Sequence, residues 1–575
     1  MSFMRSYPNI PIDGGDTAAW PSASLGQEDA VKRRVRVVSL ILLVGFFLVS
    51  ARLVDLALLR GDDNVLAMVV SAPSRARADI LDRNGIVVAS DLQFPSLYVE
   101  PHQIVDIGDT IDQLLIVMPG LTRNDLLEEL TSESDFRWLK RLITPGDKAR
   151  IHNLGLPGIN FRNETGRVYP MGRTLSQVIG HVNIDNVGQA GIERYLDTRT
   201  RTPRGQMSGD VVVKPSPVTL ALDVRVAHAL RDELELAMEK FSAKAAAAVV
   251  LDADTGEVIG LSSLPDYEPT NPEESHREDR INRISKGLFE LGSTFKIFTI
   301  AMALDEGVAT LDSRYDARKP FKVFGEKIKD HHAQNKILSV PEIFIHSSNI
   351  GAAKIAIDAG METQRSFLRR IGMLDRVMTE IPETGKPRIP DPWKPISTVT
   401  ISYGYGLSVT LLHAASAAAA MVNGGYFNSP TFFKRSRAEA KIYAKRVLKA
   451  ETSLKMRYLM RLNVQQGTAK RSAVPGYRVG GKTGTAEKWV SGRYDSNRNR
   501  NTFIAAFPID DPRYIVVALL DEPKGIAETH GFSASGFNVA PTVAGIINRI
   551  APMLGVVPDQ GLEDDDAEVL LAATN

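Results

Sequence analysis

Residues 290–307 read ELGSTFKIFTIAMALDEG, and this stretch indicates what kind of domain surrounds it. Apolar residues recur through it at the spacing of a buried helix that ends at Gly307. Ser293 stands at the start of that helix, where the helix dipole and free N–H groups favour developing negative charge. Lys296 follows one turn later on the same face. The stretch therefore predicts a serine beside a lysine at a helix N-terminus.

This pair has the chemistry of a nucleophile and its base. A serine hydroxyl becomes a nucleophile when a base takes its proton, and a lysine can be that base if burial and a nearby cation lower its pKa. Alone, the pair is a weak signal, because such spacings arise by chance in most chains of this size. A helix-capping Ser293 near a solvated Lys296 is the ordinary alternative.

Two further motifs follow in order and strengthen the signal. Ser347 to Asn349 reads SSN, and Lys482 to Thr485 reads KTGT. The ordered set S-x-x-K, S-x-N and K-T-G is typical of penicillin-binding proteins and β-lactamases. In chemical terms, Ser347 can relay a proton to a leaving amine, and Asn349 can hold both the base and a substrate amide. The candidate catalytic residues are Ser293, Lys296, Ser347, Asn349 and Lys482.

The third motif is expected in a strand that begins near Tyr477. A glycine there lets a substrate backbone lie along the strand edge as an added strand. The flanking hydroxyls can bind a terminal carboxylate, and the preceding lysine supplies charge. The backbone N–H groups of Ser293 and Thr485 would form an oxyanion hole. The predicted substrate-binding residues are Thr483, Gly484 and Thr485.

Composition excludes several other classes of function. The chain has no cysteine, so disulfides, thiolate catalysis and cysteine–metal sites are impossible, and its net charge of +1 gives no sign of nucleic acid binding. Asp330 to His332 (DHH) suggests a metal site, but no second histidine pair has ligand spacing, so a polar loop is the better interpretation. We expect no metal and no cofactor. Tyr403 to Gly406 (YGYG) either lines a cleft or forms a turn packed by two tyrosines.

The N-terminal region carries a candidate membrane anchor. Val37 to Ala51 is fifteen residues without a charge, and apolar character resumes past Arg52 as far as Leu59, interrupted by Asp55. Together these residues reach the ~20 that a bilayer needs. Basic residues cluster within 32–36, which places the N-terminus in the cytoplasm. The alternatives are a buried core helix and a signal peptide cleaved after Val49-Ser50-Ala51.

The rest of the chain divides into two folded parts. From about residue 215 the pattern becomes α/β, with hairpins expected from 245–251 with 257–262 and from 501–507 with 514–520, and a helix over 539–554. The polar stretch 199–210 is a plausible linker. The expected boundaries are a cytoplasmic tail at 1–34, an anchor at 35–59, a non-catalytic pedestal at 60–205, a catalytic domain at 215–555 and a flexible tail at 556–575.

Four short segments outside the three motifs add to the pattern, namely Arg77 to Gly85, Arg167 to Gly172, Gly188 to Glu193, and Gly404 to Thr410. With the three motifs and these four boxes, residues 30–550 resemble the class B penicillin-binding family, specifically its division-specific septal transpeptidases. Ala78 replaces the usual glycine of the first box, and His413 stands where relatives commonly have glutamine.

The resemblance implies a fold and a reaction. The fold would be the α/β (α+β) transpeptidase fold, an antiparallel sheet flanked by helices, preceded by a mixed α/β pedestal and one transmembrane helix, with the catalytic domain outside the cytoplasm. The substrate would be a peptidoglycan stem peptide ending in D-Ala-D-Ala, on lipid-linked precursor glycan. Ser293 would form an acyl-enzyme that an amine of a neighbouring stem resolves, and β-lactams would acylate the same serine. The implied partner is a membrane glycan polymerase of the division machinery.

Several other functions stay open. An elongation-type transpeptidase carries the same motifs. A β-lactamase or D,D-carboxypeptidase would deliver water to the same acyl-enzyme, but no deacylating glutamate is identifiable, and a long pedestal argues against a β-lactamase. An inactive scaffold would not need the three intact motifs. A β-lactam sensor would carry several membrane spans, and only one is visible. The pedestal is short for a second enzyme, which disfavours a bifunctional glycosyltransferase.

Overall fold

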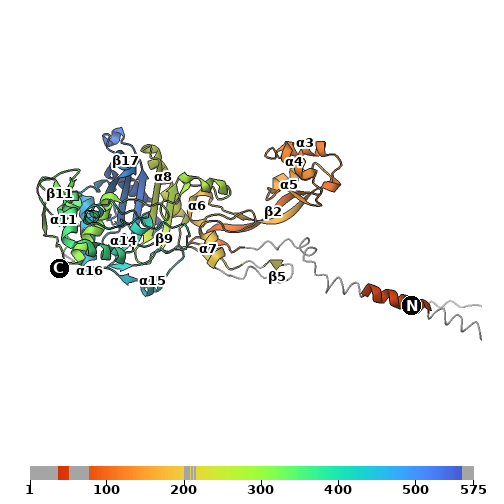
Figure 1. Ribbon diagram of the computed structural model, residues 1–575, viewed down its shortest axis with the longest axis horizontal. Coiled ribbons are helices and arrows are strands. Elements are labelled where there is room, and N and C mark those ends of the chain that lie inside the picture. The colour runs from red at the N-terminus through yellow and green to blue at the C-terminus, as the bar shows by residue number, and fades with distance from the viewer. Residues whose placement is uncertain (1–36, 51–76, 200–206, 209–210, 213–214, 560–575) are drawn as a thin grey trace, which may run out of the picture. The chain divides into compact units, whose positions relative to one another are not determined.

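The computed structural model describes residues 37–50, 77–199, 207–208, 211–212 and 215–559 (Figure 1). Two compact units result, one within residues 1–73 and one within 74–575, and each is described by itself. Of the first unit only residues 37–50 are described, and they form a helix. The predicted linker at 199–210 and the tail beyond 559 lie mostly outside the described residues.

The second unit is built on a five-stranded antiparallel sheet. Its order is β16-β17-β18-β8-β9. Strand β9 therefore lies at one edge, and β16, which carries the third motif, lies at the other. Both predicted hairpins are confirmed, since β8 pairs with β9 and β17 with β18. The bounds are β8 (Ala245–Asp252), β9 (Val258–Leu264), β16 (Gly480–Val490), β17 (Arg493–Phe507) and β18 (Tyr514–Asp521).

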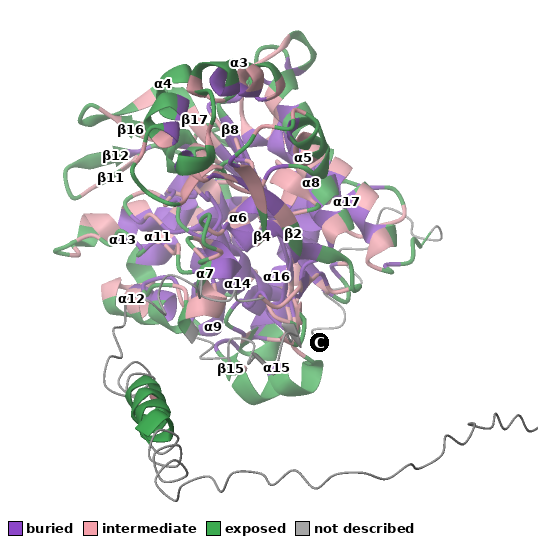
Figure 2. Ribbon diagram, turned by 90° about the vertical axis from the view of Figure 1, so that its right-hand side faces the viewer, coloured by how far each residue is buried: buried purple, intermediate pink, exposed green. Residues whose placement is uncertain are grey.

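Apolar residues fill both faces of this sheet, because successive side chains of a strand point to opposite sides. In β18, Val516, Ala518 and Leu520 belong to a core that includes helices α8 (Val224–Lys240) and α17 (Val539–Met553). The alternate residues Ile515, Val517 and Leu519 belong to the larger core on the opposite face. Figure 2 shows the buried residues gathered around these strands. The sheet is therefore covered on both sides, as the predicted fold class requires.

The helices on the second face carry the first two motifs. They pack in the larger core with α14 (Leu411–Val422), which covers the central strands, and with α16 (Ala450–Gln466), which packs against the edge strand β16. The motif-bearing elements are α9 (Lys296–Asp305), α10 (Val340–Ile345) and α11 (Asn349–Ala359). Both motifs are thus fixed to rigid, buried elements.

Two predicted boundaries need correction. The helix does not begin at Ser293: a 3-10 turn, η6 (Gly292–Phe295), precedes α9, which begins at Lys296. The third-motif strand begins at Gly480 and not near Tyr477, where a tight turn closes the bridge between Val474 and Tyr477. Turn chemistry before an apolar run is the weakest part of any pattern-based boundary.

The N-terminal part of the second unit has its own sheet. Strand β2 (Val87–Val99) pairs along its length with β4 (Ile159–Val168), and β1 (Ile80–Leu81) joins β2 to β7 (Val218–Thr219). A separate small core packs among four further elements, which are β3 (Arg137–Lys140), α3 (Ile107–Val117), α4 (Arg123–Leu130) and α5 (Pro145–His152). The helices α6 (Ser176–Ile179) and α7 (Gly191–Arg199) contribute instead to the larger core. We call residues 77–199 the pedestal.

The helix of residues 37–50 exposes its apolar side chains along its whole length (Figure 2). Phe46, for example, is 78% exposed. Within the described ranges, no helix combines the length and the apolar character needed to cross a bilayer. The predicted anchor at 35–59 extends beyond this helix at both ends, onto residues that are not described.

Candidate active site

The nucleophile candidate sits where a helix start meets the edge strand of the sheet. Ser293 lies in η6 and is partly accessible, whereas Lys296 is fully buried at the start of α9. Gly292 has φ +53°, and a Cβ there would lie 2.7 Å from the carbonyl oxygen of Thr485. Only glycine fits this position without displacing the strand. The backbone of β16 therefore runs directly past Ser293.

Lys296 is at the centre of the hydrogen bonds in the site. Its Nζ lies 2.8 Å from Ser293 Oγ, 3.1 Å from Ser347 Oγ, 2.9 Å from Ser347 O and 2.7 Å from Asn349 Oδ1. The last two oxygens can only accept. They take both N–H bonds of a neutral amine, which leaves the lone pair of Lys296 for a serine hydroxyl. The geometry thus suits a lysine that accepts a proton from Ser293.

The second motif forms the turn between α10 and α11. Ser347 has φ +58°, a left-handed conformation that costs a residue with a Cβ about 1–2 kcal/mol. Ser348 is the N-cap of α11 and accepts a hydrogen bond from Gly351 N at 2.9 Å. The strained turn directs both the hydroxyl of Ser347 and the amide of Asn349 at Lys296.

The third motif brings a second buried lysine to the same place. Lys482 is fully buried, and its Nζ donates to Thr483 O at 3.2 Å and lies 3.1 Å from Ser347 Oγ. Ser347 Oγ is therefore within hydrogen-bond distance of both lysine nitrogens. A hydroxyl in that position can pass a proton between the two.

Burial sets the charge state of both lysines. Desolvation, with a smaller contribution from Lys482, holds the pKa of Lys296 well below its ordinary value, and Asp330 opposes the shift. Desolvation alone lowers the pKa of Lys482 to about 7. Two neighbouring amines share the protons as a pair. Near neutral pH, a neutral lysine is thus available as a base.

The two predicted carboxylate-binding threonines are held by residues behind the strand. Thr483 Oγ1 lies 2.6 Å from Thr468 Oγ1, and Thr485 Oγ1 accepts a hydrogen bond from Ser535 N at 3.1 Å. Because Ser535 N donates, the hydroxyl proton of Thr485 stays free for a ligand oxygen. Gly484 is buried, and a Cβ there would lie 2.5 Å from Leu291 O.

The turn from Tyr403 to Gly406 lies beside the nucleophile. Gly404 O accepts a hydrogen bond from Gly292 N at 3.2 Å, and Tyr405 Oη accepts one from Glu487 N at 3.0 Å. The two tyrosine rings also pack against each other, with centroids 6.0 Å apart. The tyrosine-packed turn is therefore confirmed, and it contacts both η6 and β16, whereas the alternative that this segment lines a cleft stays a prediction.

The structure brings together every predicted catalytic and substrate-binding residue, and adds three that the sequence analysis missed. Thr468 and Ser535 belong to no motif, and only the tertiary fold places them behind Thr483 and Thr485. Asp330 was considered only as part of a metal site, and no group of potential metal ligands is found in the described parts of the chain.

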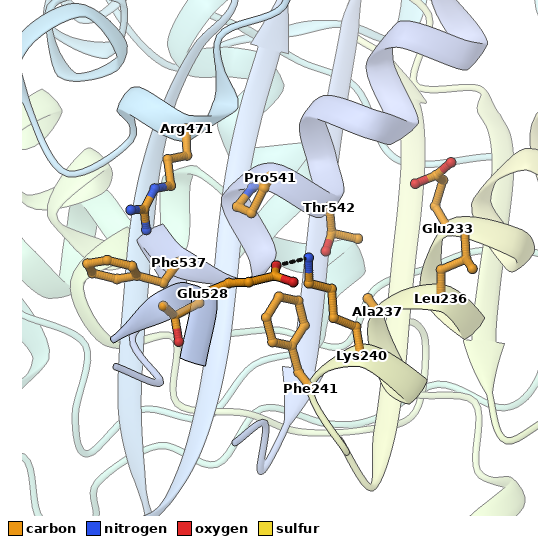
Figure 3. A pocket seen from close by; sticks show the side chains of 11 residues that line it. Glu233, Leu236, Ala237, Lys240, Phe241, Arg471, Glu528, Phe537, Pro541 and Thr542 are labelled. Carbon is orange, nitrogen blue, oxygen red and sulfur yellow. Dashed lines mark ion pairs between the residues drawn. The ribbon is translucent and has the colours of Figure 1, made fainter. Parts of the chain in front are cut away.

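A hollow of about 360 Å³ lies between α8 and α17 (Figure 3). The ion pair of Lys240 with Glu528 spans it, and the guanidinium of Arg471 stacks on Phe537 at 4.1 Å. Its lining includes none of the predicted site residues. The hollow is therefore not where the predicted chemistry takes place.

The pedestal boxes form a buried ion cluster of their own. Arg167 Nε donates to Glu193 at 2.7 Å, and Arg167 Nη1 donates to Asp91 at 3.0 Å. Arg77 forms ion pairs with Glu193 at 2.8 Å and with Asp197 at 2.7 Å. Burial alone would lower the pKa of Arg167, but the carboxylates more than offset it and the pKa is raised. All these partners lie within the pedestal, so the cluster holds the pedestal's own fold.

Comparison with known families matches both folded parts. The family described as "Penicillin binding protein transpeptidase domain" matches residues 246–545, and the one described as "Penicillin-binding Protein dimerisation domain" matches residues 73–214.

Three relatives illustrate the similarity. A protein from Caulobacter vibrioides named "Probable peptidoglycan D,D-transpeptidase FtsI" is 39% identical over 490 residues, covering 84% of this chain and 82% of the relative. The transpeptidase domain of penicillin-binding protein 3 from Burkholderia pseudomallei is 33% identical, with a TM-score of 0.53 over 59% of this chain and 97% of that domain. Mycobacterial penicillin-binding protein 3, solved with aztreonam, shares the fold at 22% identity, with a TM-score of 0.65 over 84% of this chain and 97% of that structure.

Proposed function

Because this chain belongs to the class B penicillin-binding family, we propose that it is a peptidoglycan D,D-transpeptidase that cross-links stem peptides during septal wall synthesis. The observation that carries the proposal is the 2.8 Å contact between Lys296 Nζ and Ser293 Oγ, with two obligate acceptors occupying both hydrogens of the neutral amine. The names of the relatives support the reaction and its substrate.

The acylation half-reaction follows from the contacts. Ser293 Oγ attacks the carbonyl carbon of the penultimate D-Ala, and its proton passes to Lys296 Nζ. The N–H groups of Ser293 and Thr485 stabilise the oxyanion. When the peptide C–N bond breaks, the leaving nitrogen takes a proton through Ser347, and the terminal D-Ala departs as a free amino acid.

The second half-reaction reverses these transfers. The amine of a neighbouring stem attacks the Ser293 ester, loses a proton through Ser347 or Lys296, and returns a proton to Ser293 Oγ. A new peptide bond replaces the ester. Asn349 holds the substrate amide in both half-reactions, whereas Thr483 and Thr485 bind the terminal carboxylate of the donor during acylation, before the terminal D-Ala departs. A water in place of the amine would give carboxypeptidase activity, which is the second candidate function.

Acylation is tested by mass spectrometry of the full chain in detergent after incubation with a penicillin. We expect one adduct, mapped to Ser293 and absent in Ser293→Ala, whose thermal melting should match the wild type. An adduct on another residue would overturn the assignment. A D-Ala-D-Ala donor with and without an acceptor amine then separates the two candidates, because a transpeptidase forms an amide product that a carboxypeptidase does not.

The membrane attachment is also part of the proposal. We infer that residues 35–59 are a single-pass anchor with the N-terminus in the cytoplasm and the catalytic domain outside. The exposed apolar helix at 37–50 and the basic residues before it support this topology. Protease added to intact spheroplasts should digest the C-terminal part and spare an N-terminal tag. A mature protein that begins after Ala51 would show a cleaved signal peptide instead.

The partner we propose is a membrane glycan polymerase of the division machinery, contacted through the anchor and the pedestal. The resemblance to septal transpeptidases supports it. Reconstitution of the full chain with such a polymerase should raise the rate of glycan polymerisation. An unchanged rate of glycan polymerisation, with the full chain present and folded, would contradict this proposed partner.

A further inference from the structure

The segment Lys329–Asp330 lies against the second motif, where the proposed chemistry needs it. Asp330 follows β12 (Glu326–Ile328) and is half-buried. Its Oδ2 accepts a hydrogen bond from Ser348 Oγ at 2.8 Å, and its Oδ1 accepts one from Ile350 N at 2.9 Å. The two bonds fall on either side of Asn349.

The neighbouring residue holds Asn349 itself. Asn349 Nδ2 donates to Lys329 O at 3.3 Å, while its Oδ1 accepts from Lys296 at 2.7 Å. The carbonyl of Lys329 can only accept, so it fixes which end of the amide faces Lys296. The segment therefore fixes both the backbone and the side chain of the second motif.

This support acts on a strained turn. Ser347, directly before Ser348, has φ +58°, and such a conformation persists only where its surroundings over-determine it. Ser348 Oγ accepts from Gly351 N and donates to Asp330, so the helix cap and the carboxylate hold the turn together. Without the carboxylate, Ser347 can relax away from both lysines.

We propose that Asp330 is a positioning residue for the acylation of Ser293: it holds the turn of Ser347 to Asn349 against Lys296 and places a negative charge near the paired lysines. The proposal rests on the proposed function. Two charged groups bear on Lys296, namely Lys482 from β16, which disfavours its protonation, and Asp330, which favours it.

Two roles of Asp330 predict two separate readouts. Losing the positioning should lower the maximal acylation rate, because small misplacements of catalytic groups cost up to roughly 100-fold. Losing the charge should shift the acid limb of the pH–rate profile to lower pH, because Lys296 then loses its proton more easily. A residue that only stabilises a helix would change neither quantity.

The experiment measures penicillin acylation of the full chain in detergent across pH, in the variants Asp330→Asn and Asp330→Glu. We expect Asp330→Asn to acylate roughly 10- to 100-fold more slowly and its acid limb to move lower by about 0.5 in pH or more. Asp330→Glu keeps the charge in a longer side chain, so its limb should stay in place while its maximal rate falls.

The matched control is Asp223→Asn. Asp223 is a buried carboxylate at the N-cap of α8 that accepts from Arg225 N at 2.9 Å and pairs with the Arg225 guanidinium, so the same substitution removes a buried negative charge beside a helix start in the same domain. It should lower thermal stability and leave the acylation profile unchanged.

Rates within about twofold of wild type for Asp330→Asn, or a slower rate with an unmoved limb that Asp223→Asn reproduces, would overturn the proposal. If Asp330→Asn does not fold, Asp330→Glu and Ser348→Ala carry the test, because each loosens the turn while the charge remains, and wild-type maximal rates in both would overturn it. Failure of the proposed function is separate: wild type itself would then form no Ser293 adduct.

Discussion

The candidate active site and the pedestal each bury a cluster of charged side chains, but the pKa values of these side chains shift in opposite directions, away from the charged form in the site and toward it in the pedestal. In the pedestal, Arg77 and Arg167 are matched by Asp91, Glu193 and Asp197, and the pKa values of both arginines are raised.

In the candidate active site, Lys296 and Lys482 are buried together, and the pKa values of both are lowered by desolvation. Among the residues that the structure describes, the half-buried Asp330 is the carboxylate that raises the pKa of Lys296. In the pedestal, each buried cation has carboxylate partners that keep it charged. A buried lysine that acts as a base instead needs an environment that lowers its pKa, so that it loses its proton.

The largest expected effect comes from keeping the charge of Lys296 while removing its basicity. A guanidinium does not lose its proton in proteins, so Lys296→Arg should slow penicillin acylation by more than about 10⁴-fold. Rapid kinetics with a chromogenic penicillin measures this. Arg167→Lys is the reciprocal change in the pedestal and should leave acylation near the wild-type rate. Acylation by Lys296→Arg within tenfold of wild type would contradict the role of the lysine as base.

The next effect tests the pedestal. Arg167→Met leaves Asp91 buried without a cation and leaves Glu193 with Arg77 alone, which should lower the free energy of unfolding by about 3–5 kcal/mol. Denaturant unfolding measures this. Arg123→Ala removes an exposed ion pair with Asp112 in the same region and should change stability by less than about 1 kcal/mol. Equal effects of the two substitutions would mean that burial of the cluster does not matter.

The pH dependence of stability sharpens the comparison. The folded pKa of Lys482 is about 7 and its ordinary value is 10.5, so the folded chain binds fewer protons than the unfolded chain between these limits. Stability should therefore rise with pH across this window, by at most about 1.4 kcal/mol per pH unit for this group.

Lys482→Met should be more stable than wild type near neutral pH, by about 1 kcal/mol or more, and should show a flatter pH dependence. The exposed Lys441→Met is the control and should behave as wild type. Denaturant unfolding at several pH values measures both variants. The prediction would be contradicted if the wild-type protein lost stability from neutral to alkaline pH and this loss depended on Lys482.

The smallest effect concerns uncharged support. Thr468→Val keeps the volume but removes the hydroxyl that lies 2.6 Å from Thr483 Oγ1. One neutral hydrogen bond is worth about 1 kcal/mol, so binding of a carboxylate-bearing donor should weaken about fivefold with little change in the maximal acylation rate. Saturation kinetics separates the two terms. A large fall in the maximal rate would instead make Thr468 part of the proton path.

Local pattern was enough to predict the parts of the site that lie on regular elements. The apolar period after Ser293 predicted its helix, and the glycine-flanked third motif predicted β16. The turn chemistry before each element was not predicted, which is why α9 begins at Lys296 and not at Ser293. A 3-10 turn leaves no periodic signature in so short a stretch.

Contacts made only by the tertiary fold could not be predicted in the same way. Asp330 reaches Ser348 across 18 residues of sequence, and Ser535 reaches Thr485 across 50. Neither belongs to a motif with a spacing rule. The boxes around Arg167 carry part of the resemblance to the family. The sequence pattern does not say, however, whether their charged residues pair within the pedestal or with the domain that follows it, because that depends on the tertiary fold.

The charge state of the two buried lysines tests the central claim most directly. The full chain, with lysines labelled at Cε with ¹³C, can be titrated by NMR, and Lys296→Arg and Lys482→Arg assign the two resonances. We predict that Lys482 loses its proton near pH 7 and Lys296 well below its ordinary pKa, so that both are neutral in mildly alkaline solution. If both resonances instead keep the chemical shifts of an ammonium group up to about pH 10, neither lysine is available as a base near neutral pH, and the proposed activation of Ser293 is wrong.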